Sequence, residues 1–112
     1  MMRFGLIGLG GIGEVRKQAL EVSPECKLTA AFDLDSAALA KLPDHVSVFK
    51  DAEQLMKSDA CDAVIISTPT HFHKDLVLTA LENGKHVIVE KPMASSLAQC
   101  EQMVETAERC GK

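Results

Sequence analysis

Three glycines near the start of the chain, Gly8, Gly10 and Gly13, follow the spacing GxGxxG in the stretch "GLGGIG". In this pattern the first glycine allows a tight turn, the second lets the backbone approach a pyrophosphate, and the third lets a helix lie close to its strand. An apolar strand pattern precedes the stretch and an amphipathic pattern follows it, which favours a phosphate-binding loop over a glycine-rich turn without a ligand. The loop residues expected to bind are Gly8, Leu9, Gly10, Gly11, Ile12 and Gly13.

An acidic residue stands where such a loop needs one. Asp33 lies twenty residues after Gly13, at the end of a second apolar run, and a carboxylate there binds the adenosine ribose hydroxyls. It also repels a 2'-phosphate, and no basic residue follows until Lys41, so NAD is favoured over NADP. The alternative is that "DLD" only caps a helix, a role that Asp35 fits better.

The stretch "STPTHFH" leaves the fourth apolar run, and it places Thr68, Pro69 and His73 at the same edge of the predicted sheet. Thr70 is the expected N-cap of the following helix. His71 and His73 lack a third ligand at a recognisable spacing, so no metal site is predicted. For His71, an exposed residue at the start of a helix is the simpler interpretation.

The stretch "EKP", Glu90 to Pro92, ends the last apolar run at this edge. A lysine at a strand end is usually only solvated. Here Pro92 fixes the chain direction after Lys91 and can form a cis bond, which favours a functional lysine beside the cofactor crevice.

Short apolar runs alternate with segments of helical period, which is typical of βαβ units and predicts a doubly wound, Rossmann-type α/β fold with a parallel sheet. Runs such as "AVII" and "VIV" suit strands covered on both faces. The predicted strands are Arg3 to Gly8, Lys27 to Asp33, Val46 to Phe49, Asp62 to Thr68 and His86 to Glu90.

Five helices are expected between and after these strands. The first presents Ile12, Val15, Ala19 and Leu20 to the core, and the last presents Leu97, Cys100, Val104 and Ala107. Phe72, Leu76, Ala80 and Leu81 form the buried face of the fourth, which ends at Gly84. The N-caps expected for the other helix starts are Asp35 or Ser36, Asp51 with Gln54, and Ser96 with Gln99.

Length, charge and cysteine content favour a small cytoplasmic domain that does not bind nucleic acid. The chain of 112 residues is long enough for one small domain, and its net charge of -4 argues against a nucleic-acid partner. The apolar start fails as a signal peptide and no run is long enough to span a membrane. The four cysteines form no CxxC pair, which favours reduced thiols and a cytoplasmic location.

The fifth predicted strand has no sixth beside it, although the full doubly wound order is 3-2-1-4-5-6. It would be an apolar edge, which soluble proteins cover. We therefore expect residues 1–112 to be a truncated nucleotide-binding domain, with the sixth strand and a substrate domain absent, or a domain whose edge is covered by a second copy in a homo-oligomer.

With "GLGGIG", "AFDLD", "STPTHFH" and "GKHVIVEKP" in this order, the whole chain resembles the N-terminal domain of the Gfo/Idh/MocA oxidoreductases. The resemblance implies hydride transfer between a nicotinamide cofactor and a sugar, polyol or related substrate. Lys91 would match the family's catalytic EKP lysine. Thr68, Pro69 and His73 would match the TPNxxH loop that lines the cofactor, and Glu90, Lys91 and Pro92 would complete the cofactor-binding set.

Two positions depart from the family pattern, because Thr70 replaces the usual Asn and Arg16 stands where a His often follows the glycines. In the family a second domain carries the substrate pocket and a residue that exchanges the hydroxyl proton, so this chain alone is expected to bind cofactor without turnover. The alternatives are a stand-alone dinucleotide-binding or sensing module, which has no use for Lys91, and a scaffold that no longer binds nucleotide.

Overall fold

The computed structural model describes all residues 1–112 and has five strands, five α-helices and one 3-10 turn. Each strand begins within one residue of its predicted start, and each ends within one residue of its predicted end except β4, which ends at Ile66 and not at Thr68. The order along the chain is β1 (Met2–Ile7), α1 (Gly11–Val22), β2 (Cys26–Phe32), α2 (Ser36–Ala40), β3 (Ser47–Val48), α3 (Ala52–Lys57), β4 (Ala63–Ile66), η1 (Thr70–Phe72), α4 (His73–Glu82), β5 (His86–Val89) and α5 (Leu97–Cys110).

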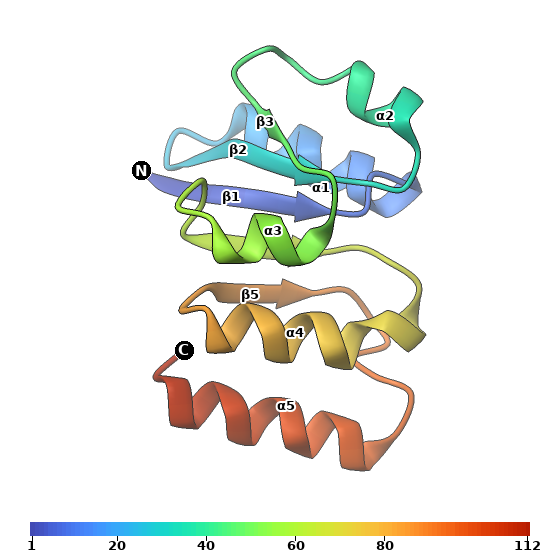
Figure 1. The fold of residues 1–112 in the computed structure, drawn as a ribbon, viewed down its shortest axis with the longest axis vertical. Helices are drawn as coiled ribbons and strands as arrows, with labels where there is room; N and C mark the ends of the chain where they lie inside the picture. Colours follow the sequence, from blue (N-terminus) through green and yellow to red (C-terminus); the bar gives the residue numbers. More distant parts are fainter.

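The strands form one parallel sheet in the order β3-β2-β1-β4-β5, which confirms the predicted Rossmann-type topology (Figure 1). β1 lies at the centre, where Ile7 pairs with Phe32 on one side and with Ile66 on the other. Because the strands are parallel, their carboxyl ends meet at one edge of the sheet. Every predicted binding motif follows one of these ends.

Two hydrophobic clusters cover the two faces of the sheet. One contains buried residues of α3, α4 and α5, and the other contains Leu20 of α1 with the partly buried Leu39 of α2 packed against it. All four residues of β4 are buried, as predicted for a strand covered on both faces, whereas Ile88 of the edge strand β5 is 48% exposed. No helix of the chain is both long and apolar enough to cross a membrane.

The predicted inward face of α1 was wrong for three of its four residues. Leu20 is buried, but Ile12, Val15 and Ala19 are exposed. The helix is instead turned so that Gly13 faces the sheet, because the missing side chain there permits the closest approach to β1.

The predicted face of α5 was also displaced. Leu97 and Val104 are exposed, while Met103 and Thr106 are buried. Thr106 can be buried because its hydroxyl donates to the carbonyl of Gln102 at 2.8 Å.

Helix starts follow the predicted capping chemistry with one exception. The side chains of Asp35, Asp51 and Ser96 accept from the backbone N–H groups of Ala37, Gln54 and Gln99. Thr70 is not an N-cap, because it begins the 3-10 turn η1 and its backbone carbonyl accepts from His73. Pro69 before it favours this tighter entry into the helix.

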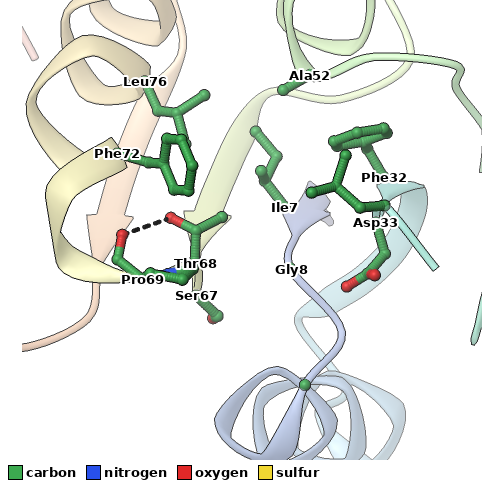
Figure 2. A pocket seen from close by; sticks show the side chains of 12 residues that line it. Ile7, Gly8, Phe32, Asp33, Ala52, Ser67, Thr68, Pro69, Phe72 and Leu76 are labelled. Carbon is green, nitrogen blue, oxygen red and sulfur yellow. Dashed lines mark hydrogen bonds between the residues drawn. The ribbon is translucent and has the colours of Figure 1, made fainter.

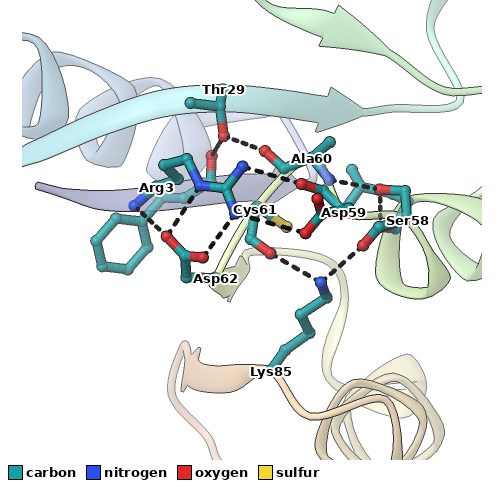
Figure 3. Close-up of polar contacts among 10 residues, drawn as sticks. Arg3, Thr29, Ser58, Asp59, Ala60, Cys61, Asp62 and Lys85 are labelled. Carbon is teal, nitrogen blue, oxygen red and sulfur yellow. Dashed lines mark hydrogen bonds and ion pairs between the residues drawn. The ribbon is translucent and has the colours of Figure 1, made fainter.

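At the amino ends of the strands, polar side chains join segments that are distant in sequence (Figure 3). Arg3 forms a two-point ion pair with Asp62, in which Nε–Oδ2 is 3.1 Å and Nη2–Oδ1 is 2.8 Å. The ammonium group of the buried Lys85 donates to the carbonyls of Ser58 and Cys61, both at 2.7 Å. These contacts tie β1, β4 and β5 together at the edge opposite the predicted site.

Candidate dinucleotide-binding site

In the glycine loop between β1 and α1, Gly8 and Gly13 are needed for the turn and for packing, whereas Gly10 and Gly11 face open space. A Cβ at Gly13 would lie 2.1 Å from the carbonyl oxygen of Gly8, and Gly8 itself has φ +99°. These two glycines are therefore required by the turn and by the close packing of helix on strand. A Cβ at Gly10 or Gly11 would meet nothing within 4 Å, so the loop is open toward solvent at these residues.

The first turn of α1 offers free hydrogen-bond donors beside this open face. The N-cap is Gly10, which has no side chain to accept from the helix, so the N–H groups of Gly11, Ile12 and Gly13 have no partner within it. Free N–H groups and the positive end of the helix dipole together favour an anion.

Asp33 follows β2 and holds the glycine loop directly. Its Oδ2 accepts from the N–H of Leu9 at 2.6 Å, and its Oδ1 accepts from the N–H of Asp35 at 2.7 Å. Each oxygen keeps a further lone pair, so the carboxylate is oriented and can still accept from a ligand hydroxyl. The helix cap is the neighbouring Asp35, as the sequence analysis favoured.

A cavity of about 360 Å³ lies between the ends of β1, β2 and β4. Figure 2 shows Thr68, Pro69 and Phe72 on one side of it, Phe32 and Asp33 on the other, and Ile7 with Gly8 between them. Gly10 also lines this cavity, while Leu9 and Gly11 line a separate groove between α1 and α2 that contains Lys17 and Lys41. The apolar walls were not predicted from the sequence. Phe72 was expected on the buried face of the fourth helix, which is wrong: it lies in η1, is 46% exposed and lines the cavity.

Ser67 is a further residue that the sequence analysis missed. It lines the same cavity and is 9% exposed, and its hydroxyl has no hydrogen-bond partner. Buried hydroxyls are nearly always paired. Its position directly before Thr68 was the only available signal.

His73 lies beneath the crevice and does not line the cavity. It is 1% exposed, its Nε2 is 2.9 Å from the carbonyl oxygen of Thr68, and its Nδ1 is 3.0 Å from that of Pro92. Both ring nitrogens thus face backbone carbonyls from two different strand ends. In this geometry the imidazole links the loop after β4 to the loop after β5.

Glu90, Lys91 and Pro92 follow β5 at the same edge of the sheet but do not line the cavity. Lys91 is exposed, and the bond between Lys91 and Pro92 is cis. Glu90 forms an ion pair with Arg16 of α1, and the hydrogen bond from Arg16 lowers the pKa of the Glu90 carboxyl. This carboxylate is therefore charged at neutral pH.

Comparison with known proteins identifies the family. A model described as an oxidoreductase family with an NAD-binding Rossmann fold matches residues 2–112. This chain belongs to the Gfo/Idh/MocA family. As a member of that family it has the fold of a domain that binds a nicotinamide dinucleotide.

Individual relatives support the same assignment. Myo-inositol 2-dehydrogenase of Thermotoga maritima is 32% identical over 111 residues, which cover 96% of this chain and 33% of that protein. A glycosyl hydrolase family 109 protein of Shewanella baltica is 33% identical over 124 residues and is covered to 27%.

Among solved structures, scyllo-inositol dehydrogenase of Lactobacillus casei, with bound NAD(H) and scyllo-inositol, superposes with a TM-score of 0.90 at 30% identity. The match covers 99% of this chain and 34% of that one. The chain thus spans about a third of the length of the relatives named here.

The residues of the crevice fit a nicotinamide dinucleotide. The open backbone at Gly10 and Gly11 leaves room for a pyrophosphate, and Asp33 presents acceptors for ribose hydroxyls. The unpaired hydroxyl of Ser67 is a third polar group at the same cavity. When bound, such a cofactor supplies a nicotinamide ring that accepts or donates a hydride.

Proposed function

We propose that residues 1–112 are the cofactor domain of an NAD-dependent oxidoreductase, whose substrate is a sugar, polyol or related hydroxyl or carbonyl compound. The observation that supports the proposal is the hydrogen bond between Asp33 and the N–H of Leu9, because it brings the Asp33 carboxylate next to the loop that leads into the free N–H groups of α1. The inositol substrates of the named relatives support the substrate class. In this proposal the substrate pocket is formed by residues outside 1–112.

In this proposal Gly8 to Gly13 form the pyrophosphate loop, and Thr68 and Pro69 line the cofactor crevice. Glu90 and Pro92 hold the strand end that carries Lys91, and His73 supports both loops from beneath. Lys91 is the catalytic residue of this domain. An ammonium group beside the reacting carbon donates hydrogen bonds to the substrate oxygen and stabilises the negative charge that develops there.

We further propose a preference for NAD over NADP. Asp33 is held with both oxygens at the mouth of the crevice, so a 2'-phosphate would approach a fixed negative charge. Of the two lysines in the neighbouring groove, Lys17 is already paired with Glu14 at 3.1 Å. The remaining basic residue of this groove is Lys41, the C-cap of α2.

The test is calorimetric titration of the chain with NADH and with NADPH. The unmodified chain should bind NADH more tightly. In Asp33→Asn, which keeps an acceptor for Leu9 but removes the charge, the preference should fall by about tenfold or more, which equals about 1.4 kcal/mol. Asp44→Asn is the matched control, because Asp44 is an exposed acid whose side chain forms no hydrogen bond or ion pair. Tighter NADPH binding by the unmodified chain would refute the preference, and binding of neither would refute the cofactor role.

A stand-alone binding or sensing module remains the second candidate. A relative named as a hydrolase shows that membership of the family does not fix the net reaction. The exposed Lys91 at the strand end favours the catalytic proposal, since a sensor needs only the glycines and Asp33.

A further inference from the structure

Lys91 makes no contact of its own that could fix its position. Its side chain is exposed and forms no ion pair, and neither its backbone nor its side chain takes part in a hydrogen bond. A catalytic group must nevertheless be held close to its productive geometry. The residues on either side of Lys91 must therefore supply the restraint.

Both neighbours of Lys91 are anchored, each to a different helix. The N–H of Glu90 donates to the carbonyl of Ile66 at 3.0 Å, and its carboxylate, only 12% exposed, pairs with Arg16 of α1. On the other side, the carbonyl of Pro92 lies 3.0 Å from the imidazole of His73 at the start of α4. Lys91 is the one residue between these two anchors.

The helix that carries Arg16 is the same helix whose first turn faces the cofactor. Arg16 lies one turn beyond Gly13, at a position where its side chain crosses from α1 to the end of β5. An arginine suits this span, because its guanidinium keeps its charge and directs several donors. The contact therefore connects the pyrophosphate-binding element to the strand end that bears Lys91.

We propose that Arg16 is a positioning residue: by pairing with Glu90 it fixes the end of β5, and with it Lys91, relative to the cofactor-binding helix α1. The inference rests on the proposed catalytic role of Lys91. It gives a role to Arg16, which stands where the family often has a histidine.

The test is a measurement of backbone order by ¹⁵N relaxation in the free 112-residue chain. In the unmodified chain the amide of Lys91 should have an order parameter above about 0.8. In Arg16→Ala it should fall below about 0.6, while the amides of Val87 and Val89 stay rigid because the sheet ladder holds them. Glu90→Gln should reproduce the effect, and Arg16→Lys should recover at least half of the lost order.

The matched control is Arg109→Ala, which removes another ion pair between two elements, Arg109 with Glu82 at 3.7 Å, away from the crevice. It should leave Lys91 unchanged. Undiminished order at Lys91 in Arg16→Ala would overturn the inference, and so would an equal loss along all of β5, which marks a merely structural contact. NADH titration of the unmodified chain is a separate readout, so a failure of the proposed function would be recognised independently.

Discussion

Gly10 and Gly13 belong to one motif, yet alanine should act differently at the two positions: at Gly13 it should lower the stability of the fold, and at Gly10 it should lower the affinity for NADH. In Gly13→Ala the new Cβ lies 2.1 Å from the carbonyl oxygen of Gly8, so helix α1 must move away from β1. Overpacking of this kind costs about 1–3 kcal/mol or more, and the better helix propensity of alanine returns up to about 1 kcal/mol. We expect a net loss of about 2 kcal/mol, which lowers Tm by about 8 °C in a chain of this size.

In Gly10→Ala the new methyl group meets no atom within 4 Å, and φ −67° with ψ −166° is an extended conformation open to any residue. Stability should change by less than about 1 kcal/mol, which covers the replacement of an N-cap glycine. The methyl group does enter the space proposed for the pyrophosphate, so affinity for NADH should fall by about tenfold or more.

Thermal unfolding followed by circular dichroism and calorimetric titration with NADH separate the two effects. Each variant serves as the control for the other, since both add the same methyl group to the same loop. Unchanged stability of Gly13→Ala, or unchanged NADH affinity of Gly10→Ala, would contradict the roles given to these two glycines.

Two further predictions concern the amino edge of the sheet. Lys85→Met leaves the carbonyls of Ser58 and Cys61 without a donor and should lower the free energy of unfolding by about 3 kcal/mol, measured by urea unfolding. Lys57→Met breaks only the exposed ion pair with Glu53 and should change stability far less, so equal losses would contradict the buried role of Lys85. Hydrogen bonds from Arg3 lower the pKa of Asp62 from 3.8 to about 2. The ion pair therefore stabilises the fold fully above pH about 4, and this contribution is lost as the pH falls toward 2. Asp62→Asn should reduce the fall in Tm over this pH range, and an unchanged dependence of Tm on pH would show that the pair contributes nothing.

Local chemistry made much of the fold predictable from the sequence. The caps at Asp35, Asp51 and Ser96 were predicted correctly because capping depends on residues two or three positions apart. The sheet order followed from the alternation of strands and helices, which leaves few topologies once right-handed crossovers are required.

What could not be predicted depends on contacts between distant segments. The rotation of α1 is set by how closely Gly13 approaches Gly8, and the spacing of apolar residues in the sequence does not predict that distance. For the same reason Met103 and Thr106, rather than Leu97 and Val104, form the inward face of α5.

In the candidate site, too, local features were predictable from the sequence and contacts between distant segments were not. The positions of Gly10, Asp33 and Thr68 followed from their places at strand ends, which a parallel sheet brings to one edge. The burial of His73 could not be predicted in this way, because it depends on contacts with the carbonyls of Thr68 and Pro92, and Pro92 lies in the loop after β5. The pairing of Arg16 with Glu90 spans 74 positions and has no local signal.

In the proposed function, a nicotinamide dinucleotide lies across the carboxyl edge of the sheet, over the first turn of α1. The most direct measurement is a ¹H–¹⁵N correlation spectrum of the chain during titration with NADH. Saturable shifts are expected for the amides of Gly10 to Gly13, Asp33 and Thr68, and none for Arg3 or Asp62 on the opposite edge. Absence of shifts in the folded chain, or shifts confined to the opposite edge, would contradict the proposed function.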